Sequence, residues 1–349
     1  MKQVFNSSKS VQLSQALLNC YLELKWGIVI LSSLAIVTGC GSSSPLETNF
    51  CNTNYFFNDT TNSSKDSIKI TFLGTSALLI DDGATQILTD PYFSRHGLWS
   101  VIFSKLSTKK NVVDSICNHY KMDRINGIFV SHSHYDHAFD IGYVAEKTKA
   151  PVYGSSSTLT IARGAGICES KLNLFNTCEE VVLGDFRITV IPALHSPPAW
   201  YNNDIGQTID CEFKQPACAK KYKEGGSFDL LIKHKDHSIY IKPSANFLFG
   251  GLDCITVDVL LLGIGGIGNE SKKFKKTYYK ETVGKLNPKL IIPIHWDNFF
   301  KPLSDLLVLM PRPIDNTSKT LKFIKRKTKN DKKELKILQG GKSIILFKD

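Results

Sequence analysis

Residues 131–137 read Ser-His-Ser-His-Tyr-Asp-His and directly follow an apolar, strand-like run. In an extended chain, side chains two positions apart point to the same face, so His132 and His134 can bind one metal ion. Asp136 and His137 lie past the following turn and can reach a second ion. Three imidazoles and a carboxylate at the exposed end of a strand therefore predict a metal site.

Further ligands must come from distant parts of the chain. His195 follows the strand-like run 186–191 and opens a proline-containing loop, and His295 follows the apolar run 290–294. Both histidines stand where a strand ends, and side chains at such exits can face a cleft. The other four histidines lack this context and are expected to have surface or turn roles: His96, His119, His234 and His237.

Taken together, these motifs resemble those of the metallo-beta-lactamase-fold hydrolases. The matching residues run in family order after residue 68: Phe72–Ser76, Leu78–Ile80, Thr89–Pro91, the His-X-His-X-Asp-His core, His195 and Pro293–Trp296. Three more motifs resemble a bacterial, lipoprotein-like branch of that superfamily: Glu224–Phe228, Pro243–Phe247 and Gly263–Gly266. The resemblance implies an α/β fold with four layers, an αββα sandwich.

The resemblance also implies a set of ligands. A first ion would be held by His132, His134 and His195. A second would be held by Asp136, His137 and His295. The implied metal is zinc, as one or two ions, with manganese or iron as alternatives.

One position departs from the family pattern. Most relatives place a bridging aspartate at the end of a late strand, where this chain offers Ser244. A neutral hydroxyl is a weaker zinc ligand than a carboxylate and brings no charge to offset two close dications. The second site is therefore expected to bind metal more weakly. Asp136 would then act as a catalytic group, either as a base or by orienting the nucleophile.

Asp90 stands in Thr-Asp-Pro, after a strand-like run. The family places such an aspartate beneath the metal ligands, where it can accept the far ring N–H of a ligand histidine. The alternative is that Asp90 only caps the turn before Pro91.

The insertion from Ser196 to Gly226 contains four aromatic residues: Trp200, Tyr201, Phe213 and Tyr222. It is expected to form a substrate lid, or else to pack as a small core of its own. Two cysteine pairs, Cys211 with Cys218 and Cys168 with Cys178, are candidates for disulfides. The glycine-rich run 263–268 lacks the lysine and hydroxyl of a phosphate loop and is expected to form a turn at the rim of the cleft.

The N-terminal segment carries an apolar run at residues 26–38. A membrane-spanning helix needs about 20 apolar residues, so this run better fits the core of a signal peptide. Val37–Cys40 resembles a bacterial lipobox, with Cys40 as the lipidated residue; an uncleaved anchor is the alternative. We therefore expect residues 1–40 to be a signal or anchor, 41–67 a flexible linker, and 68–349 the catalytic domain. The mature protein would be a membrane-anchored lipoprotein of the cell envelope, facing outside the cytoplasm.

Apolar periodicity predicts strands near 68–73, 77–81, 86–89, 127–130, 186–192, 228–234, 238–241, 256–262 and 289–293. Helices are predicted from His137 and near 155–164, 272–285 and 316–328. Gly340–Gly341 predicts a hairpin between strands 335–338 and 343–347.

Charge is uneven along the chain. The formal net charge is +11, and residues 319–349 contain eleven basic and three acidic side chains. Such a surface favours anionic headgroups or an acidic partner. The leading hypothesis is a membrane-tethered hydrolase that uses metal-bound hydroxide on an ester, lactone, amide or phosphodiester of a small or lipid-like molecule. The alternatives are a metal-dependent nuclease, although no RNA-binding domain is visible, and a noncatalytic metal-binding lipoprotein.

Overall fold

The computed structural model describes residues 56–57, 67–177, 179–199, 203–304 and 306–348. The chain divides into two compact units, and the fold and the candidate site both lie in the unit of Ser43–Met310 and Ile314–Asp349. The expected signal segment 1–40, with Cys40, lies outside the described residues. So does the expected linker 41–67, apart from residues 56–57 and 67.

A first sheet of seven strands has the order β16-β2-β3-β4-β5-β6-β7. Strands β16 to β4 pair antiparallel and β4 to β7 pair parallel. The strands are β2 (Ile68–Phe72), β3 (Leu78–Asp81), β4 (Gln86–Thr89), β5 (Ile125–Phe129), β6 (Val152–Gly154), β7 (Leu172–Leu174) and β16 (Ser343–Leu346).

A second sheet of seven strands has the order β14-β13-β12-β11-β10-β9-β8. Its parallel strands β12 and β13 are buried along their whole length, because both faces of the sheet are covered there. The strands are β8 (Glu180–Leu183), β9 (Phe186–Ala193), β10 (Ser227–His234), β11 (His237–Lys242), β12 (Val259–Gly263), β13 (Leu290–Ile294) and β14 (Glu334–Leu335). A separate short pair joins β1 (Phe56–Phe57) to β15 (Ile337–Leu338).

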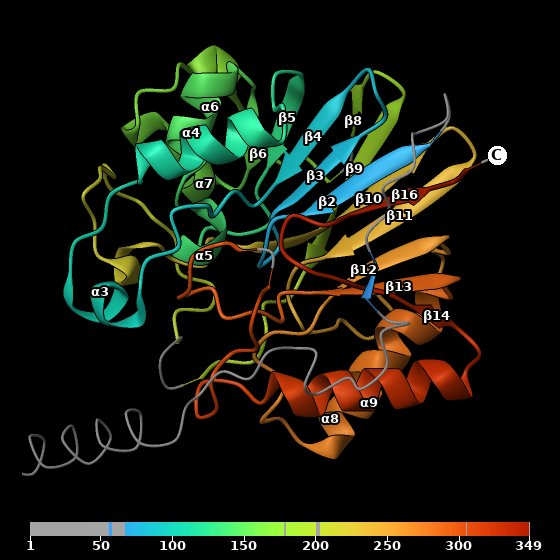
Figure 1. The fold of residues 1–349 in the computed structure, drawn as a ribbon. Helices are drawn as coiled ribbons and strands as arrows, with labels where there is room; N and C mark the ends of the chain where they lie inside the picture. Colours follow the sequence, from blue (N-terminus) through green and yellow to red (C-terminus); the bar gives the residue numbers. More distant parts are fainter. Residues whose placement is uncertain (1–55, 58–66, 178, 200–202, 305, 349) are drawn as a thin grey trace, which may run out of the picture. The chain divides into compact units, whose positions relative to one another are not determined.

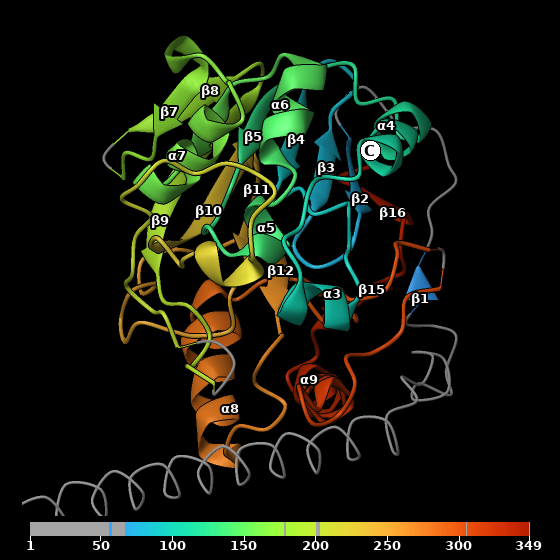
Figure 2. The ribbon, with the colours of Figure 1, turned by 90° about the vertical axis from the view of Figure 1, so that its left-hand side faces the viewer.

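The two sheets face each other and helices cover their outer faces (Figures 1 and 2). The first sheet is covered by α4 (Lys110–His119), α6 (Ile141–Thr148) and α7 (Ser156–Gly164), and the second by α8 (Lys272–Tyr279) and α9 (Thr317–Asn330). One core cluster joins residues of both sheets, such as Phe72 and Leu230. Another joins the first sheet to its helices and includes Ile128, Val144 and Ile161. The predicted four-layer αββα sandwich is confirmed.

The predicted C-terminal hairpin is wrong. β14 pairs in parallel with β13 of the second sheet, whereas β16 pairs antiparallel with β2 of the first. The turn at Gly341 has a φ of +71° and donates its backbone N–H to the carbonyl of Phe72, so it carries the chain from one sheet to the other. A glycine pair predicts a turn but not which strand each arm will join.

The predicted disulfide between Cys211 and Cys218 is also wrong, because both thiols are free. The segment between them is tied to the core and not to itself: Phe213 is buried, and Ala217 forms a β-bridge with Leu106. Cys168 is a free thiol as well, and Cys178 lies outside the described residues. Among the helices that the structure describes, none combines the length and apolar character needed to cross a bilayer.

Candidate metal centre

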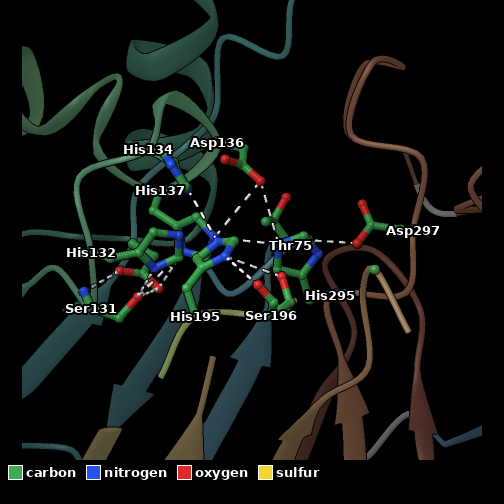
Figure 3. A network of polar contacts seen from close by, with 12 residues as sticks. Thr75, Ser131, His132, His134, Asp136, His137, His195, Ser196, His295 and Asp297 are labelled. Carbon is green, nitrogen blue, oxygen red and sulfur yellow. Dashed lines mark hydrogen bonds and ion pairs between the residues drawn. The ribbon is translucent and has the colours of Figure 1, made fainter. Parts of the chain in front are cut away.

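Four segments bring the predicted ligands to one edge of the two sheets (Figure 3). Three of these segments follow the end of a strand, as predicted from the sequence, and the fourth is a short helix. β5 leads into His132 and His134, the short helix α5 (Tyr135–Ala138) carries Asp136 and His137, β9 precedes His195, and β13 precedes His295.

The first group consists of His132, His134 and His195, all buried, each offering one ring nitrogen within 4.8 Å of the others. His134 Nδ1 and His195 Nε2 are 3.2 Å apart. Two nitrogens bound to one tetrahedral zinc ion at about 2.0–2.1 Å would lie about 3.3 Å apart. His132 Nε2 is buried and has no hydrogen-bond partner among the described residues. A buried nitrogen lone pair without a partner, beside two converging nitrogens, fits a metal ion.

The second group consists of Asp136, His137 and His295. Nε2 of His137 and Nε2 of His295 are 3.3 Å apart, and Asp136 Oδ2 lies 3.4 Å from the latter nitrogen. The two groups adjoin, because the ring centroids of His132 and His137 are 3.8 Å apart. The donor set therefore fits one ion in each group.

Burial and neighbouring imidazoles set the charge of the first group. Burial, reinforced by His134, lowers the pKa of His195 to about 3, and burial lowers the pKa of His132 well below its ordinary value. Both rings are thus neutral at pH 7, the state in which an imidazole nitrogen binds metal.

In the second group, the neighbouring side chains favour charged forms of Asp136 and His295. Burial would raise the pKa of the Asp136 carboxyl, but His137 and His295 outweigh it and hold that pKa below its usual range. Burial likewise opposes protonation of His295, but the carboxylate of Asp136 raises the pKa of this ring. Asp136 is therefore an anion that can bind a metal ion, and such an ion would replace the proton on His295.

Asp90 lies beneath the ligands, as predicted from the family pattern. Its Oδ2 is 2.8 Å from His137 Nδ1 and also accepts from the Ser131 hydroxyl, and its Oδ1 accepts from the Ser131 backbone N–H. A proton on His137 Nδ1 leaves Nε2 of that ring free to bind metal. Ser131 Oγ also lies 3.2 Å from His132 Nδ1, so one carboxylate orients ligands of both groups.

His295 is held through its backbone. Its N–H donates to the carbonyl of Thr75 at 2.6 Å, and the N–H of Thr75 donates to Asp297 Oδ1 at 2.8 Å. The other oxygen of Asp297 pairs with the fully buried guanidinium of Arg95. His295, Thr75, Arg95 and Asp90 all have positive φ angles, a strained backbone state that clusters at functional sites.

Two residues that position ligand histidines are not predicted from the sequence. Asp204 Oδ1 lies 2.9 Å from His134 Nε2, and the Asn246 side chain donates to the backbone carbonyl of His195 at 2.6 Å. Asn246 belongs to the loop after β11 that also contains the buried Ser244. The predicted weakness of the second site at Ser244 remains a prediction.

Two aromatic residues of the insertion after His195 pack inward. Phe213 and Tyr222 are buried, contact each other at 4.6 Å between ring centroids, and belong to the core between the first sheet and its helices. For these two residues, packing accounts for the aromatic character. Trp200 and Tyr201 lie outside the described residues, and a lid role for them remains a prediction.

The four other histidines take no part in these two groups. His234 is nevertheless buried, and together with Asp82 and Asp185 it forms a third group of potential ligands. Its Nε2 is 3.2 Å from Asp82, whose other oxygen accepts two backbone N–H groups of the β3–β4 turn. These hydrogen bonds show that Asp82 caps the β3–β4 turn.

A family comparison agrees with this geometry. The family described as the beta-lactamase superfamily domain matches residues 69–295. The chain belongs to the beta-lactamase superfamily. The matched region contains all six ligands of the two groups.

Individual relatives are more distant. A UPF0173 metal-dependent hydrolase of Rhizobium etli is 30% identical over 129 residues, which covers 37% of this chain and 48% of that protein, so the chain spans about half its length. A UPF0173 protein of Pyrococcus furiosus is 24% identical over 232 residues, covering 66% of this chain and 85% of that protein.

Solved structures share the fold. Igni18, a metallo hydrolase from Ignicoccus hospitalis, has a TM-score of 0.50 at 17% identity and covers 81% of this chain and 100% of its own. CmlA, a diiron beta-hydroxylase from Streptomyces venezuelae, has a TM-score of 0.50 at 14% identity, over 82% of this chain and 55% of that one. At these identities the likeness speaks for the fold alone.

Proposed function

We propose that this protein is a metal-dependent hydrolase, tethered to a membrane, that cleaves an ester, lactone, amide or phosphodiester of a small or lipid-like molecule. The observation that carries the proposal is the convergence of six donor side chains, from four segments, into two adjoining groups of three. The names of the UPF0173 relatives support the reaction class. The apolar run 26–38 and Cys40 support the tether.

His132, His134 and His195 would hold the first ion, and Asp136, His137 and His295 the second. Zinc in such a donor set supplies Lewis acidity and makes hydroxide available near neutral pH. Zinc is the metal best matched by imidazole nitrogens with a carboxylate, and iron or manganese are alternatives.

The chain's own residues fix the orientation of the reacting groups. Asp136 Oδ2 faces His295 Nε2 at 3.4 Å and His137 Nε2 at 3.7 Å, so its carboxylate points into the second group. When the second site holds no ion, this carboxylate can accept a hydrogen bond from an attacking water and align that water with the scissile bond. Asp90 keeps His137 in the tautomer that carries its proton on Nδ1.

Two other functions draw on specific features. The basic stretch 319–349 favours a nuclease, and Ser244 in place of a bridging aspartate favours a noncatalytic metal-binding lipoprotein. We prefer the hydrolase, because all six donor side chains of the two groups are present and the UPF0173 relatives are named metal-dependent hydrolases.

The proposal is tested with the purified full chain and a panel of chromogenic esters, lactones and bis-phosphodiesters, with single-stranded nucleic acid alongside. We expect turnover of one small-molecule class, loss of turnover in chelator, and recovery on adding zinc. His132→Ala should be inactive and His119→Ala, at an exposed position, fully active. A fully metallated protein inert towards every substrate would favour the noncatalytic alternative.

Asp136→Asn tests the orienting role. The amide keeps the shape of the carboxylate but loses its charge, and we expect kcat to fall by about 10²–10⁴-fold. Metal content measured on the same sample separates loss of orientation from loss of an ion. Unchanged kcat at unchanged metal content would remove Asp136 from the reaction.

A further inference from the structure

The short helix α3 (Leu98–Phe103) is an apolar element that the fold covers only in part, through Val101, which packs against the core of the first sheet and its helices. Its sequence is Leu-Trp-Ser-Val-Ile-Phe, and none of its residues is buried. Trp99, Ile102 and Phe103 are 43%, 54% and 72% exposed, and the rings of Trp99 and Phe103 stack with centroids 5.9 Å apart. An apolar helix of a globular protein normally packs its apolar face on the core. A contiguous apolar surface turned outward marks an interaction site.

The surroundings of α3 are basic. Residues 91–113 contain no acidic side chain, and three exposed lysines follow the helix: Lys105, Lys109 and Lys110. The β-bridge between Leu106 and Ala217 brings a second basic turn alongside, with exposed Lys220 and Lys221. Exposed aromatic residues are thus flanked by cations on two neighbouring segments.

The same end of the fold carries the metal centre. Figures 1 and 2 place α3 on the same side of the fold as α5, the helix that carries Asp136 and His137. Ring contacts join the two regions: Tyr92 packs on Tyr135 of α5 at 5.7 Å between ring centroids. His96 packs on Phe139 at 5.2 Å.

We propose that α3 docks onto the surface of an anionic lipid bilayer, with Trp99, Ile102 and Phe103 inserted at the level of the headgroups and the lysines against lipid phosphates. Tryptophan and phenylalanine beside lysine are the composition of interfacial helices. A stable protein partner would need about 800 Å² on each side, more than a helix of six residues offers. Cationic side chains around an apolar centre complement an anionic membrane surface.

This contact extends the proposed membrane function, since it would turn the metal centre towards lipid-borne substrates. The docking of α3 is nevertheless measured by vesicle binding and not by turnover. A protein that binds vesicles but has no activity would contradict the proposed hydrolase and not the docking. An active protein that does not bind vesicles would contradict the docking alone.

The test uses the full chain in vesicles of phosphatidylcholine and phosphatidylglycerol that contain brominated acyl chains. The chain has four tryptophans, so the emission of Trp99 is obtained as the difference between the wild type and Trp99→Phe. We expect brominated lipid to reduce the Trp99 emission by about twofold or more, because the ring reaches the acyl boundary. Vesicles without phosphatidylglycerol, or high salt, should weaken the effect.

Two charge variants provide the matched comparison. Phe103→Asp places a carboxylate on α3 and should abolish the quenching of Trp99. Leu174→Asp changes another exposed apolar residue, 61% exposed on β7, and should leave the quenching unchanged. Both positions face solvent, so both variants should fold, which their thermal unfolding checks.

Unquenched Trp99 in anionic brominated vesicles would overturn the proposal. So would Trp99 emission that resists aqueous iodide before any lipid is added, because a protein surface would then already cover α3.

Discussion

The side chains behind the ligands set how firmly an ion can be held. Asp90, Asp204 and Asn246 each contact a ligand histidine or its backbone. Asp90 was predictable from the family resemblance, in which the aspartate of the Thr-Asp-Pro motif lies beneath the metal ligands. Asp204 was not, because it lies within a long irregular insertion, and sequence spacing does not tell where such a chain returns.

Asp90→Ala should weaken metal binding without removing a ligand. His137 would lose the acceptor that fixes its tautomer, so we expect metal affinity to fall by about 10–100-fold. Competition with a chromogenic chelator measures this. Asp258→Ala, at a half-buried carboxylate paired with an exposed lysine, is the control and should bind metal as the wild type does. Equal affinity in both variants would mean that Asp90 only caps its turn.

The ion pair of Arg95 with Asp297 makes a residue-scale prediction about stability. Both side chains are fully buried, so Asp297→Ala leaves a buried guanidinium without its counter-ion. We expect the free energy of unfolding to fall by about 3–5 kcal/mol. Lys289→Ala breaks the exposed pair with Asp258 and should cost about 0–1 kcal/mol. Urea unfolding of both variants makes the comparison, and similar costs for the two would contradict it.

At the level of elements, the ends of three strands position the ligands of the metal centre. β5, β9 and β13 were predictable from apolar periodicity, and so was the edge at which their ligands meet. The sheets that the last strands join were not predictable, because the neighbouring stretches 335–338 and 343–347 predict a hairpin, whereas β14 and β16 belong to different sheets. Local sequence specifies a strand, but pairing depends on the surfaces left open by the rest of the fold.

The glycine-rich run after β12 supports the site by close packing. A Cβ on Gly265 would stand 2.5 Å from His295 Nδ1 and 2.7 Å from its backbone oxygen. Gly265→Ala should therefore displace His295 and lower occupancy of the second site, while the first site keeps its metal. The same change at Gly97, where no atom lies within 4 Å, should have no effect. Metal content per chain reports the difference, and full loading of Gly265→Ala would show that the turn does not position His295.

At the scale of the described domain, the last strand of the chain pairs with the first strand of the first sheet. β16, near the C-terminus, pairs with β2 at the start of the described domain, and Ser343 Oγ lies 2.9 Å from Thr71 Oγ across the pair. The last strand thereby completes one edge of the first sheet. The loops that carry the ligands emerge from a core that joins both sheets. Such a scaffold holds ligands distant in sequence within reach of one ion.

Metal content of the purified full chain is the most direct test of this account. We expect one tightly held ion per chain, a second held more weakly because of Ser244, and loss of the tight ion in His132→Ala but not in His119→Ala. Wild-type protein that retains no stoichiometric metal, or His132→Ala protein that retains the tight ion, would contradict the proposed centre.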